Sequence, residues 1–178
     1  MAGVTRRAAL APGLAAAAGM AACTPIGGAG TGIASDLPEG SRIVLVRHMD
    51  RDNGTLNAMG LQRAQDLVAA IADIPLDDIY THDLRRNVDS ARPLAQARAI
   101  EMTLIDLDRA PGSLPGLAAG RSIIWVGNRG NLAEIWNVLS LPGAPPRLGY
   151  GDIAVVEAAP ARRLTVERRR FGPRPSTD

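Results

Sequence analysis

An arginine and a histidine at the end of a short apolar run are the first residues of this chain that could do chemistry. The run at residues 43–46 is rich in β-branched side chains, and it stops abruptly at Arg47 and His48, with the acidic Asp50 close behind. A strand here would deliver a cation and an imidazole to its carboxyl end, where open α/β sheets bind their ligands. The sequence therefore predicts a ligand site around Arg47 and His48.

Two later stretches strengthen this prediction. Residues 56–65 read Leu-Asn-Ala-Met-Gly-Leu-Gln-Arg-Ala-Gln, and residues 79–91 read Ile-Tyr-Thr-His-Asp-Leu-Arg-Arg-Asn-Val-Asp-Ser-Ala. In order and spacing, residues 42–97 resemble the histidine phosphatase superfamily, the phosphoglycerate-mutase-like or RHG family. That family has Arg-His-Gly-Glu after a strand, then a Leu-Thr-x-x-Gly-x-x-Gln-Ala helix and a second arginine in a later helix. The remainder of the chain resembles it only loosely.

The resemblance implies a role for each residue of a phosphate pocket. His48 would be the nucleophile that takes a phosphoryl group as a phosphohistidine, provided that a hydrogen bond holds one ring nitrogen and the other presents its lone pair. Arg47 and Arg86 would clamp the phosphoryl oxygens, since a guanidinium fork matches a phosphate bidentately. Arg85 would be solvated, and Asn57 would be either a phosphate contact or only a helix cap.

The chain departs from the family at one position of this pocket. After the strand expected at 122–126, the family has a second histidine, whereas this chain has Asn128. Asparagine can donate a hydrogen bond to a phosphate oxygen but carries no charge, and losing one such group typically costs about a hundredfold or more in rate. Arg129, the next residue, could supply the missing charge.

The proton donor for the leaving group stays open at this level. Many members of the family carry an acid just after the third strand, where this chain has Asp106 and Asp108. Three further residues are candidates only through their expected nearness to strand ends: Asp52, His82 and Asp83. Met49 stands where the family has glycine or alanine, and it is expected to crowd a pocket that the backbone normally lines closely.

The elements that must position these residues follow from hydrophobic periodicity. The alternation of strands and helices predicts a three-layer α/β/α sandwich of the α/β class, with a mostly parallel sheet and an antiparallel, charged edge. Strands are expected at 43–46, 79–81, 101–105, 122–126, 153–158 and 162–170, and helices at 58–72, 84–97 and 131–139.

Three details of these elements can be tested against the structure. Asn57 is the expected N-cap of the first helix, and Gln62, Arg63 and Asp66 are expected to face solvent. Pro93 should end or kink the second helix. Residues 106–120 contain two prolines and three glycines, and they are not expected to be a regular helix throughout.

The composition limits the classes of function. The chain has 178 residues, 46% of them hydrophobic, which suits one compact domain. Aromatic residues make up only 3%, so a base-stacking surface is not expected. The formal charge of +2 comes from Arg6 and Arg7, so the basic balance is no evidence for nucleic-acid binding. Two histidines without clustered acids give no metal-ligand spacing, and no cofactor is implied.

The amino terminus indicates export. Residues 1–22 carry two arginines before an Ala/Gly/Leu-rich run, as a secretory signal peptide does, and Thr5-Arg6-Arg7 is also compatible with twin-arginine export. Met20-Ala21-Ala22-Cys23 resembles a bacterial lipobox, whose cysteine is lipidated and becomes the first residue. An ordinary cleavage site with an incidental cysteine is the alternative.

These features together predict the domain organisation and the location. Residues 1–22 are the expected signal peptide, 23–40 the lipidated Cys23 with a flexible tether, and 41–178 the histidine-phosphatase-like domain. The protein is expected on the periplasmic side of a bacterial envelope, anchored in the outer membrane rather than the inner one.

Three hypotheses for the function remain open. The first is a phosphomonoesterase that acts on a phosphorylated small molecule or an exposed phosphate through His48. The second is a catalytically inactive, membrane-tethered domain that binds phosphate or another anion. The third is a structural or interaction lipoprotein. Asn128 favours the second and third hypotheses, whereas Arg47, His48 and Arg86 favour the first two.

Overall fold

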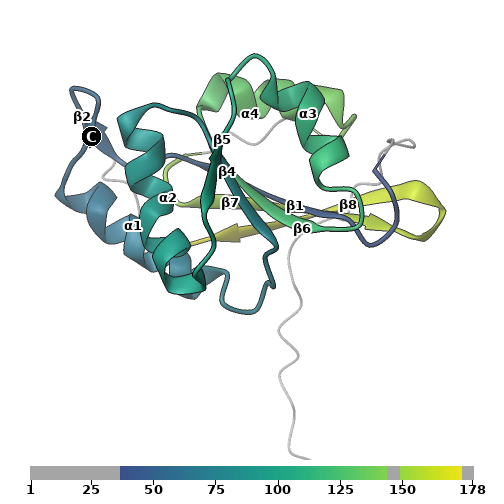
Figure 1. Ribbon diagram of the computed structural model, residues 1–178, viewed down its shortest axis with the longest axis horizontal. Helices are drawn as coiled ribbons and strands as arrows, with labels where there is room; N and C mark the ends of the chain where they lie inside the picture. Colours follow the sequence, from purple (N-terminus) through teal and green to yellow (C-terminus); the bar gives the residue numbers. More distant parts are fainter. Residues whose placement is uncertain (1–36, 144–148, 174–178) are drawn as a thin grey trace, which may run out of the picture.

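A six-stranded sheet runs through the centre of the molecule, and helices cover both of its faces (Figure 1). The computed structural model describes residues 37–143 and 149–173, so the predicted signal peptide, Cys23 and most of the tether lie outside the described residues. The strand order is β5-β4-β6-β1-β7-β8. The strands are β1 Arg42–Arg47, β4 Asp78–Thr81, β5 Met102–Leu104, β6 Ser122–Gly127, β7 Asp152–Ala159 and β8 Arg163–Arg170.

Strands β5, β4, β6 and β1 are parallel to one another. The carboxyl ends of β4, β6 and β1 therefore lie side by side at one edge of the sheet. β1 pairs with β6, β6 with β4 and β4 with β5, all in parallel, whereas β7 is antiparallel to β1 and β8 is antiparallel to β7. A 3-10 turn at Pro160–Arg162 joins β7 to β8. The predicted α/β fold with a mostly parallel sheet and an antiparallel, charged edge strand is confirmed.

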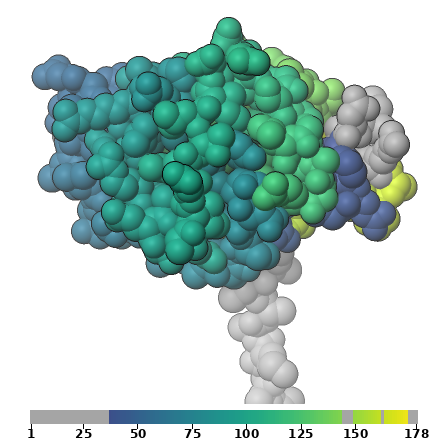
Figure 2. Space-filling view, in the orientation of Figure 1, coloured from purple at the N-terminus to yellow at the C-terminus, as the bar shows by residue number. Residues whose placement is uncertain are grey.

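Alternating side chains of the strands build two separate cores. Ile43 and Leu45 of β1 lie in the core beneath α3 (Ala110–Leu117) and α4 (Arg129–Val138). Val44 and Val46 point the other way, into the core beneath α1 (Ala58–Ala70) and α2 (Arg85–Arg98). Because both faces of β1 are buried, its sequence is a continuous apolar run rather than an alternating one. Figure 2 shows one side of the molecule, where the chain from α2 to α3 covers the sheet.

The folded domain starts before Ser41. Leu37 is fully buried in the core beneath α3 and α4, and the Gly40 amide donates to the carbonyl of Ala158 at 3.1 Å. The last residues of the predicted tether therefore belong to the domain, because Leu37 packs into its core. The Gly- and Pro-rich sequence around Leu37 does not indicate this contact.

Three details of the elements can now be compared with the structure. Residues 106–120 are not a regular helix throughout, as predicted, although residues 110–117 within them form a helix despite Pro111 and Pro115. Pro93 does not end α2, which continues to Arg98, so the first of its two predicted alternatives was wrong. The short antiparallel strands β2 (Arg51–Asp52) and β3 (Thr55–Leu56) were not predicted at all, since two-residue strands carry no periodic pattern.

Arg63 is the largest correction within a helix. It was expected to face solvent, but none of it is exposed, and its Nε donates to Asp50 Oδ2 at 2.6 Å. Its Nη1 donates to the carbonyls of Phe171 and Pro173 at 3.0 and 2.9 Å. The partners come from two parts of the chain outside the helix, Asp50 before it and residues 171–173 far after it, so the spacing within the helix could not reveal them.

Candidate functional site

The site lies where two neighbouring parallel strands end. β1 ends at Arg47 and β6 at Gly127, which are partners in the register of the two strands. The His48 amide continues this pairing and donates to the Gly127 carbonyl at 2.9 Å. The next residue of β6 is Asn128, so the sheet itself brings the predicted nucleophile next to the position where the family has its second histidine.

His48 is held as a neutral ring with one nitrogen in use. The residue is only 3% exposed, and its Nδ1 lies 2.9 Å from the Met49 carbonyl oxygen. A carbonyl can only accept, so Nδ1 carries the proton and donates, and Nε2 keeps its lone pair. A nucleophilic histidine requires this tautomer, with one ring nitrogen held by a hydrogen bond and the other free.

Burial is the main reason why the His48 ring stays neutral. The pKa of His48 is lowered to about 4: burial contributes most, the hydrogen bond to Met49 opposes it, and the cations Arg47, Arg86 and Arg51 add to the lowering. At pH 7 the ring is therefore a free base and can attack an electrophile without first losing a proton.

The lowered pKa of His48 predicts a loss of stability in acid. The unfolded chain binds a proton on this ring near pH 6.5, whereas the folded protein does so only near pH 4, so the unfolding free energy falls as the pH drops through this interval. Between pH 7 and pH 5 the expected loss from this ring is about 2 kcal/mol. Urea unfolding at both pH values should show a smaller loss for His48→Gln than for the parent, and equal losses would contradict the assigned pKa.

Three arginines surround His48 and none of them forms an ion pair within the described residues. Arg47 and Arg86 each have a buried Nε without a hydrogen-bond partner in that part of the chain. Burial lowers the pKa of Arg86, and the neighbouring cations Arg51 and Arg47 lower it further. Cations crowded together without counter-charges are costly, and such an arrangement indicates an anion-binding site.

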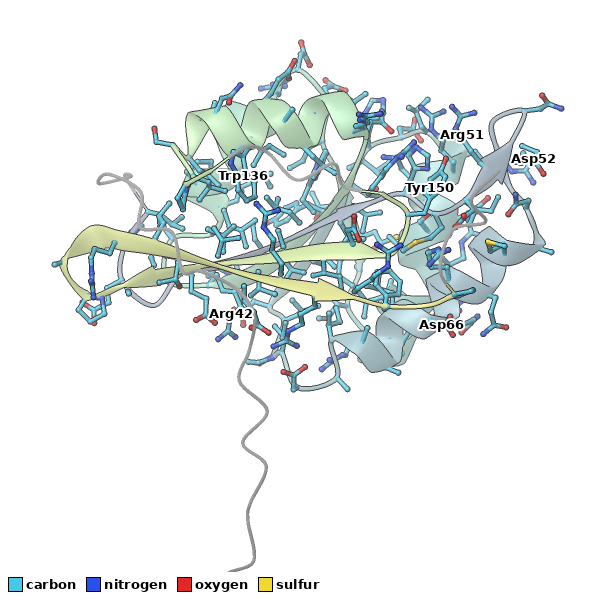
Figure 3. The ribbon with its side chains drawn as sticks, turned by 180° about the vertical axis from the view of Figure 1, so that it is seen from behind. Arg42, Arg51, Asp52, Asp66, Trp136 and Tyr150 are labelled. Atoms are coloured by element: carbon cyan, nitrogen blue, oxygen red, sulfur yellow. The ribbon has the colours of Figure 1, made fainter. Side chains whose placement is uncertain are left out.

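Sequence reasoning missed Arg51 as part of this site. It begins the short strand β2, and this hairpin turns it back toward the end of β1, on the same end of the molecule as Tyr150 (Figure 3). Its charge acts on both His48 and Arg86. The third cation that the structure brings close to His48 is therefore Arg51. Arg51 and Arg129 are both exposed, but Arg129, the predicted source of that charge on the first turn of α4, is not among the charges that act on His48 or Arg86.

Ser90 fixes the distance between α2 and the loop that follows β1. Its Oγ accepts from the Met49 amide at 2.8 Å and donates to the Arg86 carbonyl at 2.6 Å. The Ser90 hydroxyl thus links Met49, which follows the predicted nucleophile, to Arg86, which carries a predicted phosphate-binding guanidinium. Ser90 stands where the family has threonine, and it keeps the hydroxyl that this link needs.

Met49 does not crowd the pocket as predicted. Its side chain is fully buried in the core beneath α1 and α2, so it points away from the ligand edge. Asp50 is also turned inward, where it pairs with the buried Arg63 at 2.6 Å. Both residues therefore support the loop that carries His48, and neither is placed to contact a substrate.

The two asparagines of the predicted pocket differ in their bonding. Asn57 caps α1, because its Oδ1 accepts from the Gly60 amide at 2.9 Å, so the capping alternative is confirmed. Gly60 is required there, since a Cβ would overlap the Asp50 carbonyl oxygen. Asn128 precedes α4 but makes no side-chain cap bond, and its buried Oδ1 has no partner among the described residues. The Asn128 side chain is thus not used as a helix cap in the way that Asn57 is.

Only one of the predicted acids shares a cavity with Asn128. A cavity of about 400 Å³ is lined by Leu107, Asp108, Asn128, Gly130, Asn131 and Glu134. Asp106 lines a different cavity, together with Tyr80, and Asp52 and Asp83 are exposed. His82 has its Nδ1 3.2 Å from the Ile105 carbonyl. Asp108 is therefore the predicted acid that lies in one cavity with Asn128, and His48 and the arginines are not among the residues that line this cavity.

The part of the chain that the structure describes contains neither a metal-ligand cluster nor a membrane-spanning helix. Residues 37–143 and 149–173 contain no group of three or more His, Cys, Asp or Glu side chains that could hold a metal ion. Over the same residues, every helix is too short or too polar to cross a bilayer.

The fold brings the neutral imidazole of His48 and the guanidinium groups of Arg47, Arg51 and Arg86 together at the ligand edge of an α/β sheet. Clustered cations without a counter-charge at such an edge indicate a site for an anion. The model of the histidine phosphatase superfamily (branch 1) matches residues 41–108. No curated protein matches the chain.

Solved structures give the same fold. A mycobacterial glucosyl-3-phosphoglycerate phosphatase with inorganic phosphate aligns with a TM-score of 0.53 and 16% identity, over 75% of this chain and 97% of that chain. An alpha-ribazole phosphatase from Shigella flexneri aligns with a TM-score of 0.56 and 15% identity, over 74% and 96%. The protein histidine phosphatase SixA with tungstate aligns with a TM-score of 0.57 and 13% identity, over 72% and 96%.

The family match and the structural neighbours together support the histidine phosphatase superfamily. At identities of 13% to 16% the structural likeness is evidence for the fold alone. The matched residues 41–108 include Arg47, His48, Arg51 and Arg86, but they end before Asn128.

Proposed function

We propose that this domain hydrolyses phosphate monoesters through a phosphohistidine at His48. The observation that carries the proposal is the state of the His48 ring: buried, neutral at pH 7, with Nδ1 donating to the Met49 carbonyl and three unpaired arginines around it. A free lone pair on Nε2 next to an anion clamp is the arrangement that phosphoryl transfer to histidine requires.

The proposed reaction has two steps. In the first, His48 Nε2 bonds to phosphorus while the ester P–O bond breaks, and the leaving oxygen takes a proton, for which Asp108 is the proposed donor. In the second, water attacks the phosphohistidine and gives a proton to the Asp108 carboxylate left by the first step, the P–N bond breaks, and inorganic phosphate leaves. Arg47, Arg51 and Arg86 contribute by stabilising the charge that spreads over the phosphoryl oxygens in both transition states.

The substrate proposed is a small phosphorylated molecule or an exposed phosphate group. The aligned structures are phosphatases named for different compounds: glucosyl-3-phosphoglycerate, alpha-ribazole and a protein histidine. The part that these compounds share is the phosphoryl group, and the residues described here address only that group. The proposal is therefore limited to the phosphomonoester class.

A second candidate function is phosphate binding without turnover. Asn128 favours it, because an amide in place of an imidazole removes a charge from the pocket but leaves a polar group for an oxygen. In this alternative the protein would bind a phosphorylated ligand and release it unchanged. Turnover and binding must therefore be measured separately.

Replacing Asn128 by histidine is expected to raise the rate of aryl phosphate hydrolysis by about a hundredfold, because it restores a donor beside the phosphoryl group. The parent and Asn128→His should be compared at pH 7, with Asn137→His, an exposed position late in α4, as the matched control. A silent parent with an active Asn128→His protein would favour the binding function. If vanadate binds but neither protein turns over, the catalytic proposal is wrong.

We also propose that Cys23 is lipidated and tethers the domain on the periplasmic side of the outer membrane. The support is the sequence alone: a signal-like run at 1–22 and the small residues before the cysteine. In a bacterial host, Cys23→Ala is expected to move the protein from the membrane fraction to the soluble periplasmic fraction. A protein that stays membrane-bound after this substitution would contradict the anchor.

A further inference from the structure

Tyr150 is the aromatic side chain that the structure places over the proposed phosphate clamp. Its ring faces the Arg47 guanidinium, whose Cζ lies 4.2 Å from the ring centroid, and Arg47 Nη2 donates to the Tyr150 hydroxyl at 3.3 Å. The centroids of the Tyr150 and His48 rings are 5.9 Å apart, with a tilt of 56°. Tyr150 thus contacts the clamp and lies beside the nucleophile at the same time.

The backbone on both sides of Tyr150 is held in place. The Gly149 amide donates to Asp152 Oδ2 at 2.8 Å, and the Phe171 amide donates to the Gly151 carbonyl at 2.9 Å. Gly151 has a φ of +85°, and a Cβ there would overlap the Phe171 carbonyl oxygen. The position of Tyr150 is therefore fixed by the end of β8 and by the residues that precede β7.

The contacts leave the Tyr150 hydroxyl with one proton to give. It accepts from Arg47, and its own hydrogen has no acceptor among the bonds of the described residues. Arg47 Nη2 donates to the Tyr150 hydroxyl, whereas the buried Arg47 Nε has no hydrogen-bond partner among the described residues. A phosphoryl oxygen held by Arg47 beside His48 would lie within reach of both donors.

We infer that Tyr150 has two roles in the pocket: its ring positions the Arg47 guanidinium, and its hydroxyl donates a hydrogen bond to a phosphoryl oxygen. This inference rests on the proposed phosphate site. Tyr150 lies in the C-terminal part of the chain, outside residues 41–108, which the family model matches. The hydroxyl keeps its proton throughout and takes no part in bond making.

Two substitutions separate the two roles. Tyr150→Phe keeps the ring over Arg47 and removes the hydroxyl, so the affinity for vanadate should fall by about tenfold, the value of one hydrogen bond to a charged group. Tyr150→Leu removes both, and the affinity should fall by about a hundredfold. In the Tyr150→Leu background, Arg47→Gln should cost less than it does in the parent, because the guanidinium is already free to move.

The matched control is the other tyrosine of the chain. Tyr80 lies on β4 and lines the cavity with Asp106, so Tyr80→Phe should leave vanadate affinity unchanged. Vanadate binding is measured by calorimetry on the full chain, with thermal unfolding to confirm that each variant is folded. Parent-like affinity in folded Tyr150→Phe and Tyr150→Leu would overturn the inference.

The outcome also separates this inference from the proposed function. A parent that binds vanadate but hydrolyses nothing contradicts the enzyme and still tests Tyr150, because binding is the readout. A parent that binds neither vanadate nor inorganic phosphate overturns both. Loss in Tyr150→Leu but not in Tyr150→Phe would overturn the hydroxyl's role and support the ring's.

Discussion

Replacing His48 by alanine is expected to lower kcat for an aryl phosphate by about 10⁴-fold or more, because the variant has no group that can form the covalent intermediate. The residual rate would come from the arginines alone, which can still bind the phosphoryl group and polarise it. Vanadate affinity should fall far less than kcat, since the clamp stays in place. The measurement is steady-state hydrolysis together with calorimetric binding.

The same variant gives a direct test of the intermediate. Brief incubation of the parent with a radiolabelled phosphate ester and acid-free quenching should leave label on the protein, and His48→Ala should leave none. His82→Ala is the control, because it replaces the second of the two histidines. Label that persists in His48→Ala, or disappears in His82→Ala, would assign the nucleophile to another residue.

The second large effect concerns two adjacent arginines of α2. Arg86→Ala is expected to lower kcat/KM by about 10³-fold, because a partly buried guanidinium beside the proposed nucleophile contributes most when charge spreads over the phosphoryl oxygens in the transition state. Arg85→Ala should change it little. Arg85 has 77% of its side chain exposed and forms only an exposed pair with Asp89, at 3.5 Å.

Stability should respond in the opposite sense to activity. Arg86 is partly buried beside Arg47 and Arg51, and its Nε has no partner among the described residues. Removing it relieves repulsion between like charges, so Arg86→Ala should unfold at the same temperature as the parent or at a higher one. A variant that loses activity and stability together would mean that Arg86 holds the fold rather than the ligand.

Local patterns sufficed for the strand that carries the site and for its two predicted arginines. The run at 43–46 could only be a buried strand, and Arg47 and His48 follow it directly, so their place at the carboxyl edge depends on the chain alone. The cap at Asn57 is equally local, since donor and acceptor are three residues apart. Arg86 was separated from Arg85 by its spacing from Ser90, and the exposure of Arg85 agrees.

Three prolines lie within α-helices of the structure, although proline generally disfavours helix. A proline at the start of a helix costs little, because the amide it lacks would have no partner there, and Pro111 is the second residue of α3. Pro115 and Pro93 lie deeper in their helices, and packing against the sheet and against neighbouring helices holds those segments helical. Propensity alone could not weigh that packing.

The sequence by itself determined that Arg47 and His48 stand together at the carboxyl edge of the sheet, because this depends only on residues within one strand and its next few positions. Only the tertiary structure decided that Arg63 is buried, that Arg51 joins the cations around His48, and that Tyr150 stacks on Arg47 from 103 positions away. These are contacts between segments distant along the chain. No periodic pattern encodes them, since they exist only once the sheet and its helices have brought the segments together.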